Sequence, residues 1–153
     1  MVISAFILMV IIFSGITVYS GVSYFQVYGA VRAFSVTITR FDLDIVDLII
    51  ATEINIQNPS EIPFDIFVVD EAIYSKGEYV LRTSLSRYRN PLPLPARQSV
   101  SLILTAVVPD TKIETVIAGL ETSWGLWFNF QIGGPIVETF RVERSFTTVI
   151  QSI

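Results

Sequence analysis

Carboxylate side chains are the only groups in this sequence that we expect to form a catalytic or metal-binding centre. The chain of 153 residues has no histidine and no cysteine. This excludes imidazole bases, Ser-His-Asp and Cys-His nucleophiles, zinc sites, haem ligation by histidine, thiol redox centres and disulfides. A reactive centre would therefore have to be built from Asp and Glu.

One group of acidic residues has part of the spacing of a calcium-binding loop. Asp42, Asp44 and Glu53 stand at the first, third and twelfth positions of an EF-hand pattern. Val46 replaces the ligand at the fifth position, and Asp47 replaces the glycine that the loop requires at the sixth. A solvated acidic turn is the simpler interpretation.

Two pairs of acids could be considered for glycoside cleavage, which needs two carboxylates a fixed distance apart in a cleft. The pairs are Asp70 with Glu71 and Glu61 with Asp65. Nothing in the sequence fixes such a distance, and no glycine-rich phosphate loop precedes a helix. We therefore expect a protein that is not an enzyme, with no cofactor, no metal site and no identified small-molecule substrate.

The charge distribution argues against a nucleic-acid partner. The chain has 10 basic and 14 acidic residues and a net charge of −4. Its Lys and Arg residues are scattered singly, so no basic stripe is available to neutralise a phosphate backbone. We expect the partners to be a lipid bilayer and other proteins, with self-assembly as a further possibility.

The beginning of the chain has the composition of a membrane anchor. Residues 2–27 form an almost unbroken apolar run without a charge. As a helix rising about 1.5 Å per residue, this run would reach about 39 Å, more than the roughly 30 Å hydrocarbon thickness of a bilayer. Tyr19, Tyr24 and Tyr28 cluster at its end and Arg32 follows, so we expect these four side chains to lie at the membrane interface.

A cleavable signal peptide is the main alternative for this segment. Val18-Tyr19-Ser20 loosely fits the small-residue rule before a cleavage site. A basic n-region is missing, however, and the apolar run is longer than that of a usual signal peptide. We therefore predict an uncleaved transmembrane anchor over residues 1–31 and one domain over residues 32–153.

The orientation of the anchor is weakly determined by charge. Arg32 and Arg40 follow the apolar run, which would favour a cytoplasmic domain by the positive-inside rule. That rule is reliable only for short loops, and Asp42, Asp44 and Asp47 follow at once.

Beyond Ala33 the hydrophobic period changes to two residues, as in half-buried strands. Ile50, Thr52, Ile54 and Ile56 alternate with more polar neighbours. Similar runs, rich in β-branched and aromatic residues, predict about seven strands: 34–41, 50–57, 65–74, 78–84, 99–106, 126–132 and 136–149. The pattern favours a mainly β fold, an immunoglobulin-like antiparallel β-sandwich.

The segments between the strands have the residues that turns and helices need. Ser75-Lys76-Gly77 predicts a tight hairpin and Gly133-Gly134-Pro135 a second turn, while residues 90–95 form a proline-rich connector. One helix is predicted over residues 111–120, with Thr111 and Glu114 as its capping box and Asp110 as an alternative cap. Its apolar stripe should cover one end or edge of the sandwich.

Trp124 and Trp127 lie in the densest aromatic segment. Alternation directs Leu126 and Phe128 inward and Trp127 outward, so the two tryptophans are candidates for a patch that contacts lipid or a partner. A tryptophan that lies over the edge of the sandwich is the alternative. Arg144 and Glu138 interrupt an otherwise inward face, which indicates a bulge or an edge strand.

The strand that ends in Asn58-Pro59-Ser60 also has a physical interpretation. Asn58 before a proline must leave the helical region, and its amide can bond to the backbone two residues on. Proline then removes a hydrogen-bond donor from the ladder and ends the strand. A structural role for Asn58 is therefore expected, with ligand contact as the alternative.

In its order of motifs the chain resembles the LEA type 2 family, also called the WHy domain, of which LEA14 is typical. The resemblance covers residues 34–149, and the residues that carry it are Asn58, Pro59, Pro63, Gly77 and Pro95. It implies a seven-stranded sandwich with one helix behind an N-terminal membrane span, in a family associated with desiccation, stress and plant defence. No catalytic site is implied. The basic cytosolic segment that usually precedes the span in plant members is absent.

Three classes of function remain open from the sequence. The leading one is a non-enzymatic, single-pass LEA type 2 protein that acts in stress protection or binding at the membrane surface, with its domain on the extracytoplasmic side by family analogy. The second is a structural subunit of a membrane complex or an extracellular filament. The third is a carrier of lipid or another apolar ligand inside a splayed sandwich.

Overall fold

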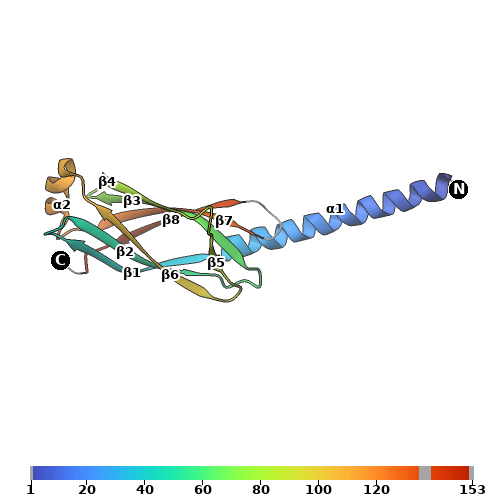
Figure 1. The fold of residues 1–153 in the computed structure, drawn as a ribbon, viewed down its shortest axis with the longest axis horizontal. Helices are drawn as coiled ribbons and strands as arrows, with labels where there is room; N and C mark the ends of the chain where they lie inside the picture. The colour runs from blue at the N-terminus through green and yellow to red at the C-terminus, as the bar shows by residue number, and fades with distance from the viewer. Residues whose placement is uncertain (1, 135–138, 152–153) are drawn as a thin grey trace.

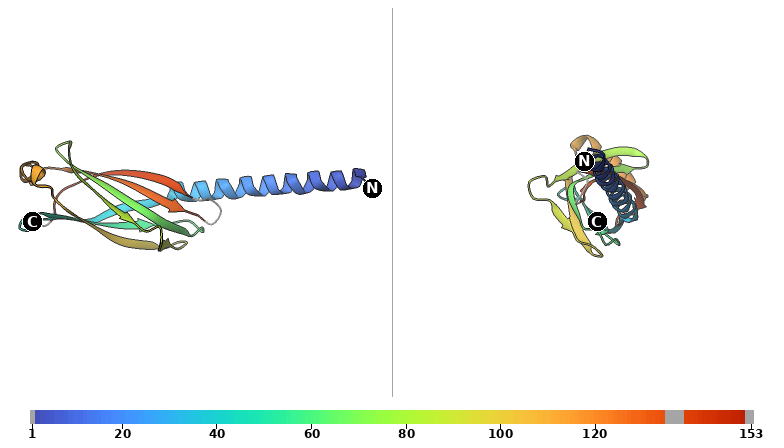
Figure 2. Two further views of the ribbon diagram at one scale, coloured as in Figure 1. Left: turned by 45° about the horizontal axis from the view of Figure 1, so that its top comes forward. Right: turned by 90° about the vertical axis from the view of Figure 1, so that its right-hand side faces the viewer.

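The protein consists of a long N-terminal helix that leads into one end of a β-sandwich (Figure 1). The structure is a computed structural model that describes residues 2–134 and 139–151, without the side chains of residues 2–6, 8, 19, 20 and 23. The first helix, α1 (Val2–Ala33), has 32 residues. It extends away from the sandwich over most of its length (Figure 2).

The helix α1 is confirmed, whereas its role in a membrane stays a prediction. No charged side chain interrupts the helix before Arg32, which lies in its last turn. Judged on the described residues alone, with positions such as 19, 20 and 23 left out, no helix of the chain is both long and apolar enough to span a bilayer.

Two antiparallel sheets form the sandwich. The first has the order β1-β2-β6, and the second has the order β4-β3-β7-β8 with β5 paired to β3. The bounds are β1 (Ser35–Asp44), β2 (Ile49–Gln57), β3 (Phe64–Ser75), β4 (Glu78–Ser86), β5 (Leu92–Leu94), β6 (Ser99–Val107), β7 (Trp124–Gly133) and β8 (Phe140–Thr148). The predicted β-sandwich is therefore confirmed, with eight strands in the described part of the chain.

The differences from the predicted elements are local. The proline-rich connector contains the additional short strand β5, in which Pro93 is opposite Asp65 of β3. The predicted start of the last strand at Ile136, together with Pro135 and Glu138, lies outside the described residues, and β8 begins at Phe140. Because β8 pairs only with β7, it is an edge strand of the second sheet.

The predicted helix is present, but its predicted capping box is not. A short 3-10 turn, η1 (Asp110–Lys112), precedes α2 (Ile113–Gly119). The turn takes up Thr111, so Lys112 becomes the N-cap of α2 and no side chain bonds to the cap. The helix lies at the end of the sandwich far from α1 (Figure 1) and buries Val116 there.

The core is filled by alternate residues of the strands. Every second side chain of β7 faces inward, and these inward residues are almost completely buried: Trp124, Leu126, Phe128, Phe130 and Ile132. The first sheet faces them with a similar row: Phe41, Leu43, Ile50, Ile54 and Ile56. Alternation that matches the pleat sets the register of both sheets.

Candidate functional site

The last turns of α1 are part of the domain core. Val27 is 1% exposed and Val31 is 5% exposed. A Cβ atom built on Gly134 would lie 3.2 Å from a methyl carbon of Val27, so the end of β7 packs tightly against the helix. The domain therefore begins before the boundary predicted after Val31, because these turns fill the open end of the sandwich.

The residues predicted for the membrane interface lie along one side of the helix end. Tyr24 and Tyr28 are 48% and 42% exposed, and their rings stack with 6.4 Å between centroids. The Arg32 guanidinium carbon lies 5.4 Å from the centre of the Tyr28 ring. These three residues form a stripe at four-residue spacing; the side chain of Tyr19 lies outside the description.

Beyond this stripe, α1 exposes apolar side chains around its whole circumference. None of the described side chains between Ile7 and Val18 packs against the sandwich. The large exposed ones are Ile7, Met9, Val10, Ile11, Ile12, Phe13, Ile16 and Val18. A helix that is hydrophobic all round is normally covered by protein or by lipid.

Asn58 joins three segments of backbone at the end of the sandwich next to α1. Its side chain, only 1% exposed, accepts a hydrogen bond from Ser60 N at 3.0 Å. Its Nδ2 donates to the carbonyl oxygens of Ile62 at 2.8 Å and Pro95 at 3.1 Å, and also to Leu94 at 3.3 Å. The bond to the backbone two residues on is the one that the sequence predicts.

The remaining residues of the family-like motif have backbone roles. Pro59 follows the end of β2, and Pro63 precedes the first residue of β3. Gly77 has a φ of 79° and Lys76 a φ of 52°, which form a tight hairpin between β3 and β4. The motif thus maps onto turns that hold the strands and not onto a reactive centre.

Trp124 is not part of a surface patch, contrary to the prediction. It is completely buried, and its Nε1 donates a hydrogen bond to the Gly119 carbonyl oxygen at 3.0 Å. Its ring lies 5.6 Å from that of Phe41 on the facing sheet. Trp124 shares the inward face of β7 with Leu126, so its role is to attach α2 to the core.

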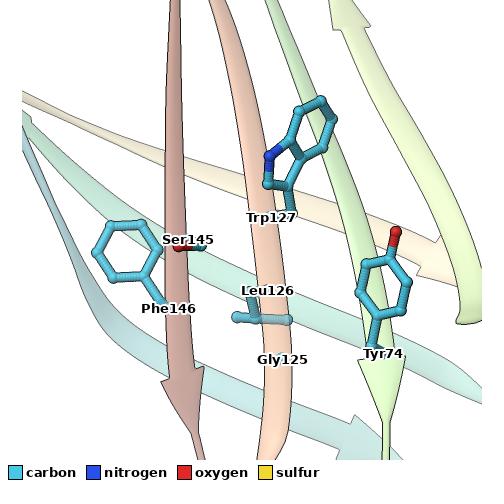
Figure 3. A pocket seen from close by; sticks show the side chains of 6 residues that line it. All are labelled: Tyr74, Gly125, Leu126, Trp127, Ser145 and Phe146. Atoms are coloured by element: carbon cyan, nitrogen blue, oxygen red, sulfur yellow. The ribbon is translucent and has the colours of Figure 1, made fainter. Parts of the chain in front are cut away.

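Trp127 does point outward, and it borders a hollow of about 430 Å³ on the outer face of the second sheet. Tyr74 of β3 and Trp127 of β7 form one side, Ser145 of β8 lies opposite, and Gly125 leaves a gap between them (Figure 3). Leu126 and Phe146 complete the lining. The hollow is shallow and open to the surface.

Glu71, which the sequence suggested only as one of a pair of catalytic acids, is a buried carboxyl group. It is 1% exposed, and its side chain points from β3 toward the first sheet. Burial raises the pKa of Glu71 to about 7, and the nearby Thr52 hydroxyl opposes this shift only partly. Within the described chain, Glu71 Oε1 and Thr52 Oγ1 have no hydrogen bond of normal geometry. The even spacing from Val69 and Ile73 could have placed Glu71 inward.

The carboxylates considered for glycoside cleavage do not form a common site. Asp70 and Glu71 are consecutive residues of β3, so they lie on opposite faces of the sheet. Asp70 is paired on the outer face with Arg82 at 2.8 Å. Glu61 is paired with Arg97. Neither pair of acids offers two free carboxylates across a cleft.

The residues considered for calcium binding form an ordinary acidic turn. Asp44 Oδ1 accepts hydrogen bonds from the backbone nitrogens of Val46 at 2.8 Å and Asp47 at 3.0 Å. Asp42 is paired with Arg40. Over residues 2–134 and 139–151 the structure contains no group of three potential ligands that could hold a metal ion.

Comparisons with known proteins show the fold of the chain. No protein-family model and no curated protein matches the sequence. A crystal structure from Bordetella pertussis described as an ApaA protein shares 13% identity at a TM-score of 0.54, over 77% of this chain and 94% of its own. A solution structure of an Arabidopsis thaliana protein shares 15% identity at a TM-score of 0.53, over 78% of this chain and 79% of its own.

A third similar structure is described as a late embryogenesis abundant (LEA) protein. It shares 13% identity over 77% of this chain and 72% of its own. Its TM-score is 0.42. The likenesses establish the mainly β sandwich as a fold that other proteins share.

Proposed function

We propose that this chain is a non-enzymatic LEA type 2 protein that α1 tethers to a membrane, with a β-sandwich that acts in stress protection or binding at the membrane surface. The domain lies on the extracytoplasmic side. The order of motifs from Asn58 to Pro95 supports the family, and the sandwich fold shared with the similar structures agrees with it. The membrane tether and the position of the domain can be tested separately.

The apolar surface of α1 is the observation that supports its role as a membrane tether. In water its exposed apolar side chains would cost about 25 cal/mol for each Å² of apolar area. Examples are Met9, Ile11 and Phe13, which are 63%, 62% and 65% exposed. A bilayer removes this cost, and the uncharged backbone of a helix satisfies its own hydrogen bonds there.

The junction fits such a tether because the last turns of α1 are packed into the domain. Val27 and Val31 are buried in the core, so the helix cannot swing freely on a linker. The exposed stripe of Tyr24, Tyr28 and Arg32 lies on the same turns of α1 that bury Val27 and Val31, and in the proposed arrangement headgroups would surround the helix there. The domain would then sit close to the lipid surface.

The tether is tested by placing two charges on α1. The double variant Ile11→Lys with Phe13→Lys should release the protein from membranes, because a lysine near the middle of a span costs about 3 kcal/mol. The measurement is the fraction that stays in the membrane pellet after an alkaline wash. Val46→Lys, at an apolar position that is 91% exposed on the domain, is the matched control and should stay in the pellet.

The alkaline wash also separates the tether from the alternatives. Release of the wild-type protein by the wash alone would contradict a spanning helix. Retention of the double lysine variant at the wild-type level would contradict it equally, since the attachment would then lie elsewhere on the protein.

A structural subunit is the second candidate function, and one observation favours it. Val46, in the turn between β1 and β2, and Val107, at the end of β6, are 91% and 68% exposed at the end of the sandwich far from α1. Exposed apolar side chains at a tip can contact a neighbouring subunit. Sedimentation in detergent tests this candidate: it predicts an oligomer that Val46→Asp dissociates.

A further inference from the structure

Charged side chains are distributed unevenly along the long axis of the protein. One end of the sandwich adjoins α1 and the opposite end adjoins α2 (Figure 1). In the described part of the chain, the end beside α1, which we call the basic end, has five exposed arginines: Arg32, Arg87, Arg89, Arg97 and Arg141. The end beside α2, the acidic end, has two lysines, Lys76 and Lys112, and six acidic residues: Asp44, Asp47, Glu78, Asp110, Glu114 and Glu121. The charge therefore changes sign from one end to the other.

Two of these arginines lie beside the end of α1. The Phe140 ring of β8 lies 6.4 Å from the Tyr24 ring, centroid to centroid, and Arg141 is the next residue of β8. On a different segment, the backbone nitrogen of Arg97 donates a hydrogen bond to the Ser60 carbonyl oxygen at 3.0 Å. Ser60 in turn lines a hollow together with the last turns of α1. Two separate segments thus bring an arginine to the junction.

The loop between β4 and β5 brings Arg87 and Arg89 to the level of Arg141. Tyr88, which lies between them in the sequence, donates a hydrogen bond from its hydroxyl group to the side chain of Gln131. Gln131 is directly opposite Arg141 in the register of β7 and β8. It stands two residues before the end of β7, about 7 Å along the strand at about 3.4 Å per residue. The three arginines therefore lie near the junction with α1.

Most of the positive charge at the basic end is not neutralised by a neighbour that the structure describes. Over residues 2–134 and 139–151, Arg97 alone among the five arginines forms an ion pair, with Glu61. In the middle of the sandwich, by contrast, Arg40 and Arg82 are each paired with an aspartate. Asp65 is the other exposed acid described at the basic end. Five arginines against two acids leave an excess of positive charge among the described residues.

This arrangement is complementary to a membrane surface that contains anionic lipids. Val27 packs against Gly134, the residue after β7, so the basic end is at the level of the headgroups if α1 spans the bilayer. A distance of about 7 Å is shorter than the screening length of about 8 Å at physiological ionic strength. The acidic end, at the start of β7, is about 30 Å away, where salt screens its repulsion. Guanidinium groups also match the paired oxygens of a phosphate.

We propose that the basic end binds the phosphate groups of anionic lipids in the leaflet that faces the domain, through Arg32, Arg87, Arg89, Arg97 and Arg141. This inference rests on the membrane tether of the proposed function and adds a lipid class to it. The contact sets the distance of the sandwich from the bilayer and holds the acidic end away from it. It does not depend on which side of the membrane the domain occupies.

The test places the full-length protein in nanodiscs that contain phosphatidylglycerol and phosphatidylcholine in equal amounts. Mass spectrometry of the protein released intact from the discs counts the lipids of each kind that remain bound. One basic residue at an anionic surface favours binding about fivefold, so the wild type should retain phosphatidylglycerol over phosphatidylcholine by at least that factor. The triple variant Arg87→Gln, Arg89→Gln and Arg141→Gln should lower this ratio at least threefold.

A matched control removes the same charge from outside the basic end. It combines Lys76→Gln and Lys112→Gln at the acidic end with Arg40→Gln in the middle of the first sheet, and it should keep the wild-type ratio. Replacement of the same three arginines of the basic end by lysine keeps the positive charge and should restore most of the preference. None of the replaced residues is buried, and circular dichroism checks that each variant is folded.

Three outcomes would overturn the proposal and leave the tether intact. One is equal retention of the two lipids by wild-type protein that is embedded in the discs. Another is an equal loss of preference in the triple arginine variant and its control, which would assign the preference to net charge. The third is an unchanged lipid ratio with loss of a dimer in the triple arginine variant, which would identify the acidic end of a second copy as the partner. Failure of the wild type to enter the discs would contradict the tether and this proposal together.

Discussion

Arg144 of β8 donates a hydrogen bond from Nη2 to the carbonyl oxygen of Phe34 at 2.8 Å. This bond joins the edge strand to the residue that directly follows α1. The Phe34 ring is 2% exposed and lies 5.3 Å from the Phe130 ring, centroid to centroid. The charged residue that interrupts the inward face of β8 therefore closes the junction between helix and domain.

Removal of Arg144 should loosen this junction. A hydrogen bond from a charged group to a buried carbonyl contributes about 2 kcal/mol, so Arg144→Ala should lower the free energy of unfolding by about that amount. Arg141→Ala is the matched control because Arg141 is exposed on the same strand. Chemical denaturation in detergent measures the free energy of unfolding of both variants. Equal stability of the two variants would contradict a stabilising role for the bond between Arg144 and Phe34.

The chain should tolerate removal of the outer part of α1 but not of its last turns. A shortened chain that begins at Ser20 keeps Val27, Ala30 and Val31 in the core, whereas one that begins at Ala33 loses all three. At about 2 kcal/mol for each buried valine, the second chain loses about 4 kcal/mol and exposes a gap between the sheets. Circular dichroism and gel filtration should find the first chain folded and the second aggregated.

Glu71 should make the stability of the protein decrease as the pH rises. Its pKa is raised by burial from 4.5 to about 7, so the folded state holds a proton that the unfolded state releases. The stabilisation is complete below about pH 4.5 and is lost as the pH rises through about 7, by up to about 3 kcal/mol. Glu71→Gln should flatten this dependence in melting curves between pH 5 and pH 8.

The surface variant Glu143→Gln removes an exposed carboxylate from β8 and is the control for Glu71→Gln. It should keep the decrease of stability that the wild type has over this range. If the stability of the Glu71→Gln protein depends on pH as that of the wild type does, groups other than Glu71 cause the dependence.

Asn58 should be a stabilising residue whose loss is not repaired by aspartate. Asn58→Ala removes the amide hydrogen bonds to the carbonyl oxygens of Ile62 and Pro95 and should cost about 3 kcal/mol. Asn58→Asp keeps the acceptor for Ser60 but removes the donor, so it should be at least as destabilising. Asn90→Ala, at an exposed position, should change the stability little, and thermal melting of the three variants compares them directly.

Much of the sandwich could be predicted because its signal is local. Alternation along a strand follows from the two-residue period of the pleat, and the Lys76-Gly77 hairpin follows from the backbone conformations that it needs. The same rule would have placed Trp124 inward beside Leu126 and Glu71 inward beside Val69. These residues were missed as core positions because aromatic and acidic side chains suggested surface roles.

The junction with α1 could not be predicted, since it depends on contacts between distant segments. An uncharged run gives no signal for the point at which a helix passes from lipid or solvent into a protein core. Val27 is as apolar as Val22, yet only Val27 is buried, because Gly134 lies beside it. The hollow at Gly125 likewise arises only when β3 and β7 are paired in their register.

The most direct test of the account uses the absence of native cysteine. Single variants Ile11→Cys and Val46→Cys are expressed in cells and treated with a membrane-impermeant maleimide before and after detergent. If α1 spans the membrane with the domain outside, Val46→Cys is labelled on intact cells and Ile11→Cys only after detergent. Labelling of Ile11→Cys at the rate of Val46→Cys without detergent would contradict the membrane tether.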